Sequence, residues 1–196
     1  MSPPRVTGVV LAAGSSRRLG TPKQLLPYRN TTVLGATLDV ARAAGFDQLI
    51  VTLGGAAQAV RDQVSLADLD VVTVEDFDTG CSASLRVALE HVDPRAAGIV
   101  LMLGDQPRMD LSTVHSFVTR APVVDIMVCR YADSIGHPFW FSHNMFGEIE
   151  QLHGDKGVWK LIESGRYPVE ELAVDGPVPL DVDTWDDYQR LLDSVS

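Results

Sequence analysis

A stretch rich in glycine, serine and basic residues, LAAGSSRRLGTPK, spans residues 11–23 directly after an apolar run. Its composition suits a phosphate-binding loop, because glycine and serine let backbone N–H groups turn toward phosphate oxygens. Gly14 and Gly20 permit close approach, and Arg18 and Lys23 supply positive charge for a triphosphate. The spacing matches neither GxGxxG nor GxxxxGK[ST], which disfavours dinucleotide-binding and P-loop interpretations. A basic surface loop without a ligand is the plain alternative.

Two acidic motifs have the chemistry of a divalent-metal site. GDQP at residues 104–107 follows an apolar run, and Asp181 and Asp183 lie near the end of the chain. Carboxylates are ligands that Mg²⁺ prefers, and two of them can align a triphosphate and offset developing charge. We expect Asp105 and Asp183 to hold Mg²⁺, with Asp181 on the same face of a short strand as Asp183. An ordinary turn at Asp105 and a helix cap at Asp183 are the alternatives.

These motifs need elements that bring the ends of strands together. Short β-branched runs alternate with segments of helical periodicity, which is typical of βαβ units. The runs predict strands over Val6–Ala12, Gln48–Leu53, Val71–Val74, Ile99–Leu103 and Asp125–Arg130. Helices are predicted over Thr32–Ala44, Ala56–Val64, Ser82–His91 and Leu111–Arg120. We therefore expect an α/β fold, a three-layer α/β/α sandwich around a mostly parallel, Rossmann-like sheet covered on both faces. Ligands bind beyond the carboxyl ends of strands in such sheets.

The rhythm changes after Tyr131, and we expect residues 131–180 to decorate the edge of the sheet. The predicted elements there are an extended Pro138–Ser142, helices over Asn144–Leu152 and Lys156–Ser164, and a strand over Val169–Val174. A final helix is predicted over Asp186–Leu192, with Thr184 as its cap. A chain of 196 residues that is 45% hydrophobic has enough apolar material for one core, so we expect a single domain over 1–196.

Composition excludes several classes of partner. A net charge of −10 disfavours binding to nucleic acid or to an anionic membrane surface, because both attract basic patches. No apolar run approaches membrane-spanning length, and the first residues do not form a secretory signal, so we expect a cytoplasmic protein. Cys81 and Cys129 form no CxxC or Cys/His spacing, which argues against a disulfide framework or a zinc site.

Over nearly the whole chain the motifs resemble those of the molybdenum cofactor nucleotidyltransferases, which share the nucleotide-diphospho-sugar transferase-like fold. LAAGSSRRLGTPKQLLP, GDQP and LDVDTWDDY resemble the family's nucleotide-binding, metal-binding and closing acidic motifs, and they would also suit sugar nucleotidyltransferases. GCSASL at 80–85, GHP at 136–138 and GDKG at 154–157 are similar to the branch that attaches CMP to molybdopterin.

The resemblance implies that CTP and molybdenum-bearing molybdopterin give molybdopterin cytosine dinucleotide and pyrophosphate, with Mg²⁺ held by Asp105 and Asp183. Arg18, Lys23 and Asp105 would be catalytic. The implied nucleotide-binding residues are Leu11, Ala12, Ala13, Gly14, Ser15, Arg18, Lys23, Gly54 and Gly80. The implied second-substrate residues are Ser82, Ser84, Gln106, Pro107, His137 and Asp155. Because the attacking phosphate of the pterin is already anionic, alignment and charge stabilisation would suffice without a general base.

The alternatives left open concern the substrates. Trp159 stands where the family commonly carries arginine, and Val74-Glu75-Asp76 replaces an asparagine-containing sequence. A guanylyltransferase and a nucleotidyltransferase acting on a sugar phosphate or another phosphorylated acceptor therefore remain open. So does a non-catalytic carrier that delivers the finished cofactor. The resemblance also suggests transient contact with a molybdenum-dependent oxidoreductase or its maturation factor.

Overall fold

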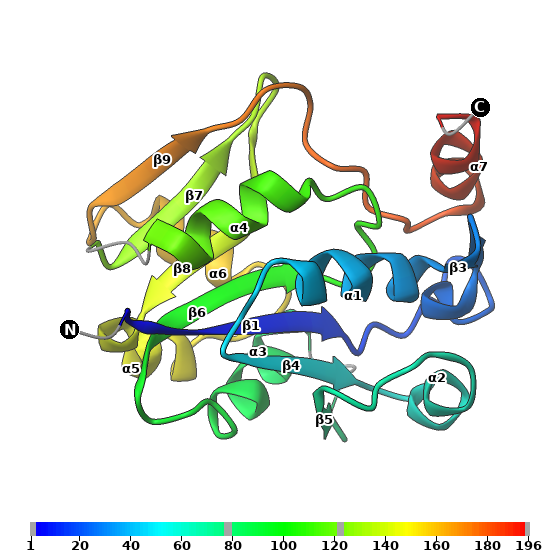
Figure 1. Ribbon diagram of the computed structural model, residues 1–196, viewed down its shortest axis with the longest axis horizontal. Helices are drawn as coiled ribbons and strands as arrows, with labels where there is room; N and C mark the ends of the chain where they lie inside the picture. Colours follow the sequence, from blue (N-terminus) through cyan, green and yellow to red (C-terminus); the bar gives the residue numbers. More distant parts are fainter. Residues whose placement is uncertain (1–2, 77–79, 121–123, 195–196) are drawn as a thin grey trace.

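A mixed β-sheet forms the centre of the molecule (Figure 1). The structure is a computed structural model and describes residues 3–76, 80–120 and 124–194. Among these residues the strands of the sheet lie in the order β5-β4-β1-β6-β8-β7-β9. They are β1 (Arg5–Ala12), β4 (Gln48–Leu53), β5 (Asp70–Thr73), β6 (Ala96–Leu103), β7 (Ile126–Arg130), β8 (Ile135–Ser142) and β9 (Val169–Ala173). Only β8 runs antiparallel to its neighbours in the described sheet. The mostly parallel sheet expected from the sequence is confirmed.

Helices cover both faces of this sheet. The first face is covered by α1 (Val33–Ala43), α2 (Ala57–Gln63) and α4 (Leu111–Arg120), and the second by α3 (Cys81–Leu89), α5 (Phe146–Glu150) and α6 (Gly157–Glu163). Val10 of β1 packs in the first core and Val9 in the second, because successive side chains of a strand point to opposite faces. The predicted three-layer sandwich is therefore confirmed.

A smaller apolar cluster ties the C-terminus to the N-terminal half. It joins α7 (Trp185–Asp193) to the short hairpin of β2 (Pro27–Tyr28) and β3 (Thr31–Thr32) through the buried residues Leu26, Tyr28, Val182 and Leu191. Figure 1 shows α7 (red) next to β3, away from the free edge formed by β9. This cluster brings the last acidic motif of the chain close to the loop that follows β1.

Local sequence sets the ends of the principal helices. The side chain of Thr32 accepts a hydrogen bond from the backbone N–H of Gly35 and so caps α1, and Gly45, at φ +85°, follows its end. Thr184 and Asp187 cap α7 reciprocally, each side chain accepting a hydrogen bond from the other's backbone N–H. Short 3₁₀ turns at Lys23–Leu25 and His143–Met145 complete the connections. None of the described helices is long and apolar enough to cross a membrane.

The prediction that the residues after Tyr131 decorate the edge of the sheet is wrong for β8. This strand lies between β6 and β7 and not at an edge, whereas β9 does occupy the edge. Phe139 and Phe141 pack in the second core and Trp140 in the first, each at most 1% exposed. A strand with large apolar side chains on both faces needs an inner position, because an edge would leave part of them in water.

The strand predicted at Val71–Val74 is also more exposed than expected. β5 begins at Asp70 and ends at Thr73, and both of these residues are exposed. It forms the opposite edge of the sheet from β9. An edge strand pairs on one side only, so it does not require the apolar cover that the inner strands have.

Gly98 of β6 offers a test of how tightly β8 is inserted. A Cβ atom there would lie 2.3 Å from the backbone oxygen of Phe141 and 2.7 Å from the Trp140 ring. We expect Gly98→Ala to lower the free energy of unfolding by about 1–3 kcal/mol, because the main chain of β8 cannot yield without breaking the ladder. Urea denaturation followed by circular dichroism measures the loss.

Gly147→Ala is the matched control. Gly147 lies within α5, and a Cβ atom there would have no neighbour within 4 Å. We expect this variant to be neutral or to gain up to about 1 kcal/mol from helix propensity. Equal unfolding free energies for the two variants would contradict the tight packing of β6 against β8.

Candidate functional site

A cleft of about 440 Å³ opens beyond the carboxyl ends of β1 and β6. It is bounded by the loop after β1, the start of α3, the turn after β6 and the acidic segment before α7. The predicted site residues that line it are Leu11, Ala12, Ala13, Gly14, Ser15, Arg18, Lys23, Gly80, Ser84, Asp105, Asp155 and Asp183. Residues of the cleft that sequence reasoning did not select are Arg17, Gln24, Cys81, Leu103, Gly104 and Asp181. With Asp155, from the turn before α6, the cleft joins five distant parts of the chain.

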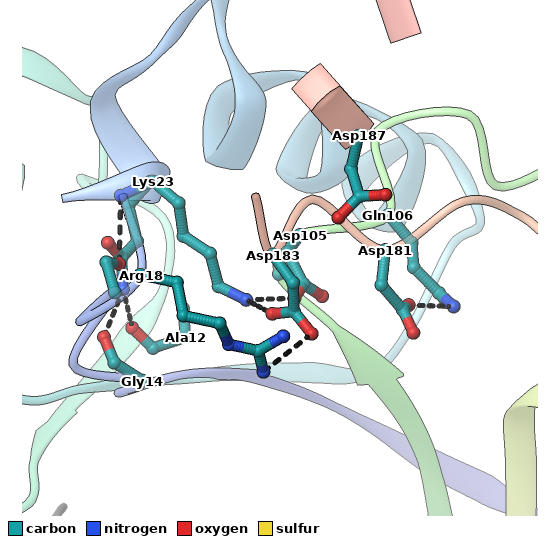
Figure 2. A network of polar contacts seen from close by, with 12 residues as sticks. Ala12, Gly14, Arg18, Lys23, Asp105, Gln106, Asp181, Asp183 and Asp187 are labelled. Carbon is teal, nitrogen blue, oxygen red and sulfur yellow. Dashed lines mark hydrogen bonds and ion pairs between the residues drawn. The ribbon is translucent and has the colours of Figure 1, made fainter. Parts of the chain in front are cut away.

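A salt-bridge network around Lys23 lies at the centre of this cleft. The Lys23 ammonium contacts Asp105 Oδ2 and lies 2.8 Å from Asp183 Oδ1, and Arg18 reaches Asp183 Oδ2 at 3.5 Å (Figure 2). The Lys23 and Asp105 side chains are only 14% and 15% exposed, whereas Arg18 is 69% exposed. The two carboxylates that sequence analysis chose as metal ligands therefore face one shared cation.

Two opposing effects act on the charge of Lys23. Burial by itself lowers the pKa of the ammonium, but the charges and hydrogen bonds of Asp105 and Asp183 outweigh burial and raise the pKa above its ordinary value of 10.5. Lys23 is therefore fully charged at neutral pH. Removing it would leave two carboxylates facing each other in a partly buried place, with the exposed Arg18 still reaching Asp183.

Gln24 holds the loop after β1 in shape. Its Nε2 donates to the backbone oxygens of Ala12, at 2.8 Å, and Gly14, at 3.1 Å, while the side chain is buried. The Ser16 hydroxyl accepts a hydrogen bond from the Lys23 backbone N–H at 3.0 Å. Gln24 was missed because a glutamine before an apolar pair has no distinctive pattern. Its contacts fix the main chain that would face a nucleotide.

The acidic segment before α7 differs from the predicted short strand. No strand is assigned over residues 181–183, although the expected alternation remains, with Val182 fully buried between Asp181 and Asp183. Asp181 also lines the cleft, and the removal of water around its carboxyl, together with the charge of Asp105, raises its pKa to about 6. The backbone N–H of Val182 donates to the Asp105 oxygen at 3.2 Å and so connects this segment to the turn after β6. This bond is not continued into the repeated backbone pairing that defines a β-strand.

The segments expected to meet the second substrate are joined to one another. Asp155 Oδ1 accepts a hydrogen bond from the Cys81 N–H at 3.1 Å, and the Ser82 hydroxyl donates to the Gly154 oxygen at 2.6 Å. Gly80, at φ +108°, has no room for a side chain, because a Cβ atom would lie 2.7 Å from the Asp155 backbone nitrogen. Of these residues Gly80, Cys81 and Asp155 line the cleft, together with Ser84, but Ser82 does not.

Other predicted site residues lie outside the described cleft. Gly54 is buried in the turn from β4 into α2, where its oxygen accepts a hydrogen bond from Ala57 N–H at 2.9 Å. Pro107 is buried beside Gln106, which is 1% exposed and donates to the acidic segment. The structure gives these three residues packing roles and does not bring them to the cleft surface.

His137 is also absent from the cleft lining and is 6% exposed. Its ring lies 4.0 Å from that of Phe139 and packs edge-on with Trp159, whose ring is also 5.2 Å from Phe139. Trp159 of α6, at the position where the family commonly carries arginine, therefore supports an aromatic cluster with His137 and Phe139 of β8. This packing gives a physical reason for an apolar residue at that position.

Comparisons with known proteins agree with this geometry. Residues 8–171 match the model of the MobA-like NTP transferase domain. The chain belongs to the MobA-like NTP transferase family. The family expected from the loop and the acidic motifs is thus confirmed. Because the members of this family are nucleotidyltransferases, the match also indicates that the protein is an enzyme.

The similarity of this MobA-like domain to known proteins covers nearly its whole length. Nicotine blue oxidoreductase of Paenarthrobacter nicotinovorans is 30% identical, with 96% of this chain and 97% of the relative covered. Rv0371c of Mycobacterium tuberculosis is 70% identical, with a TM-score of 0.94 and coverage of 98% and 100%. It has also been solved in complex with manganese, at 67% identity, a TM-score of 0.91 and the same coverage. A nucleotidyl transferase from Methanothermobacter is 25% identical with a TM-score of 0.81 and 97% coverage of both chains.

The buried His137 leads to a prediction about acid stability. Burial lowers the pKa of His137 to about 3, from an ordinary 6.5, so the folded protein holds this imidazole neutral. The unfolded chain gains the proton first as the pH falls, so the stability that depends on neutral His137 is complete above pH 6.5 and is lost toward pH 3. At pH 4.5 the expected cost is about 2–3 kcal/mol.

His137→Gln tests this linkage because glutamine does not titrate. We expect the stability advantage of the natural protein over this variant, measured by urea unfolding, to shrink between pH 7 and pH 4.5. The other four histidines are exposed, and His91→Gln is the matched control for a histidine-to-glutamine change at the surface. An identical pH dependence in all three proteins would show that His137 is not held neutral by burial.

Proposed function

We propose that this protein transfers CMP from CTP to molybdenum-bearing molybdopterin, forming molybdopterin cytosine dinucleotide and pyrophosphate. The observation that carries the proposal is the Lys23 bridge between Asp105 and Asp183, located in the same cleft as the glycine- and serine-rich loop after β1. A triphosphate needs positive charge, backbone donors and a metal site together. This cleft has candidates for all three within about 440 Å³.

The donor set fits Mg²⁺. Asp105 and Asp183 are close enough to share one ammonium ion, and carboxylate oxygens are hard ligands. Among the described residues no group of three or more His, Cys, Asp and Glu side chains could hold a metal ion. Mg²⁺ commonly uses one or two carboxylates and completes its shell with water and substrate phosphates. The manganese complex of Rv0371c supports a divalent metal in a relative of this chain.

Each group has a defined part in the proposed reaction. Asp105 and Asp183 would hold Mg²⁺, which would supply charge neutralisation for the triphosphate. Arg18 and Lys23 would bind phosphate oxygens, and Gln24 would keep the loop of Ala12 and Gly14 in place for the nucleotide. The acceptor phosphate attacks the α-phosphorus of CTP, and pyrophosphate leaves with the electron pair of the broken P–O bond. Since the nucleophile is already an anion, positioning and charge account for the catalysis.

The acceptor side of the proposal rests on Ser84 and Asp155, which line the cleft. Residues 131–180 would contribute to this side, while Ser82, Gln106, Pro107 and His137 would support it from behind. A guanylyl transfer, or transfer to a sugar phosphate or another phosphorylated acceptor, uses the same centre. A carrier would not need the network of Lys23, Asp105 and Asp183. Delivery to a molybdenum-dependent oxidoreductase or its maturation factor, in the cytoplasm, would follow synthesis.

Pyrophosphate release tests the proposed function. We expect release with Mg²⁺ and molybdenum-loaded molybdopterin when CTP is supplied, but not with GTP, ATP or UTP. Asp105→Asn should lower kcat/KM by about 100-fold or more, because a charged metal ligand is replaced by a neutral amide. Asp39→Asn, at an exposed position on α1, is the matched control and should retain activity.

The other outcomes separate the alternatives. Release with GTP alone would make this protein a guanylyltransferase, and release only with sugar phosphates would change the acceptor. Absence of release with every nucleotide and acceptor would reject nucleotidyl transfer. It would then favour the carrier, or a reaction such as that of the relative named as an oxidoreductase.

Lys23 gives a second prediction, since its ammonium occupies the space between the proposed metal ligands. We expect Lys23→Met to bind Mn²⁺ about 10-fold or more tightly than the natural protein when nucleotide is absent, because a competing positive charge is removed. Turnover should fall in the same variant, because a phosphate ligand is lost. Electron paramagnetic resonance of free Mn²⁺ measures the affinity.

Arg18→Met is the control for this experiment. It removes the same charge near Asp183, but Arg18 is exposed and lies at 3.5 Å, so its effect on Mn²⁺ affinity should be within about threefold. Thermal melts confirm that each variant is folded. Mn²⁺ binding by Lys23→Met that is equal to or weaker than that of the natural protein would contradict the shared position of Lys23 and the metal.

A further inference from the structure

The two proposed metal ligands, Asp105 and Asp183, come from segments that differ in secondary structure. Asp105 follows β6, an inner strand of the sheet, whereas Asp183 lies in residues 174–184, which contain no helix or strand. A segment without a ladder has few contacts to fix its position. The place of Asp183 relative to Asp105 therefore depends on the burial of Val182 and on side-chain bonds, which include those of Lys23 and Arg18 to Asp183 and those of Gln106.

Gln106 makes two of these bonds. Gln106 Nε2 donates to Asp181 Oδ1 at 2.7 Å (Figure 2). It also donates to the Pro179 backbone oxygen at 3.2 Å. Gln106 directly follows Asp105, and Asp181 precedes Asp183 by two residues. Val182 N–H adds a backbone bond to the Asp105 oxygen at 3.2 Å. The two segments are thus linked within two residues of each carboxylate.

We propose that Gln106 and Asp181 form a positioning pair that holds Asp183 opposite Asp105, a role that rests on the proposed function of this centre. Neither residue needs to touch the substrate. Gln106 is 1% exposed and is absent from the cleft lining, so its expected contact with the second substrate is replaced by this structural contact. The pair sets the separation of the two proposed metal ligands from outside the ligand set.

The hydrogen-bonding pattern explains why an amide occupies this position. The donor nitrogen of Gln106 serves two acceptors, while Oε1 is buried and has no hydrogen-bond partner among the described residues. A glutamate here would place a second carboxylate against Asp181. Asp181 already lies near the negative charges of Asp105 and Asp183, and the positive charge of Lys23 offsets their effect on Asp181 only in part. A neutral donor is therefore the group that can link this acidic segment to the turn.

Mn²⁺ affinity, measured by electron paramagnetic resonance, tests the pair without requiring turnover. We expect Gln106→Met to weaken Mn²⁺ binding about 10-fold, although Gln106 supplies no ligand. Asp181→Ala should weaken it at least as much, whereas Asp181→Asn, which keeps a side-chain acceptor, should recover most of the affinity. The double variant Gln106→Met/Asp181→Ala should bind no more weakly than Asp181→Ala, because either change breaks the same link.

Hydrogen exchange gives a readout that needs no metal. The backbone amides of residues 178–185 should exchange faster in Gln106→Met and Asp181→Ala than in the natural protein, while Asp181→Asn should resemble the natural protein. Unchanged exchange in Gln106→Met, or equal Mn²⁺ affinities for Asp181→Asn and Asp181→Ala, would overturn the positioning role. If the natural protein binds no Mn²⁺, the proposed metal function fails, and the exchange result alone then decides whether the link exists.

Discussion

The Lys23 ammonium between Asp105 and Asp183 is the interaction on which the arrangement of this site depends. It joins residues that are 82 and 160 positions apart in the chain, and it does so in a partly buried place. Two carboxylates so close together favour a cation between them, because an unpaired charge in a partly buried place is costly. The two carboxylates therefore need a positive charge between them. A protein can supply that charge from a side chain such as Lys23, from a bound metal ion, or from each of these in different states.

The sheet supplies the rigid side of this arrangement. β1 and β6 are adjacent and parallel, so the loop after β1 and the turn after β6 leave the same edge. Gly104 N–H donates to the Leu11 oxygen at 2.8 Å, and a side chain at Gly104 would collide with Ala12. The turn and the loop are consequently held against each other by main-chain contacts before any substrate is present. The C-terminal segment completes the site and is held by the hydrogen bonds of Gln106 and by the capping box of α7.

The opposite wall of the cleft is built differently. The start of α3 and the turn before α6 are joined by the bonds of Asp155 and Ser82, with Gly80 allowing the two main chains to approach. Behind them, His137, Phe139 and Trp159 form an aromatic support. The loop after β1, Lys23, Asp105 and Asp183 belong to other segments, so under the proposed function this wall is the part of the cleft that a change of acceptor would alter. Trp159 fits this division because its role is packing.

The sequence by itself determined the order of most elements, the three-layer class and the chemical character of the site. Apolar periodicity, caps such as Thr32 and Thr184, and the position of each motif after a strand are local properties, and local properties are readable from one chain. Tertiary structure decided the rest. Whether β8 lies inside the sheet depends on which other faces remain uncovered, and whether Gln106 or His137 faces a ligand or the interior depends on neighbours far along the chain. The pairing of Lys23 with both carboxylates was decided in the same way, because charge compensation acts through space and leaves no periodic pattern in the sequence.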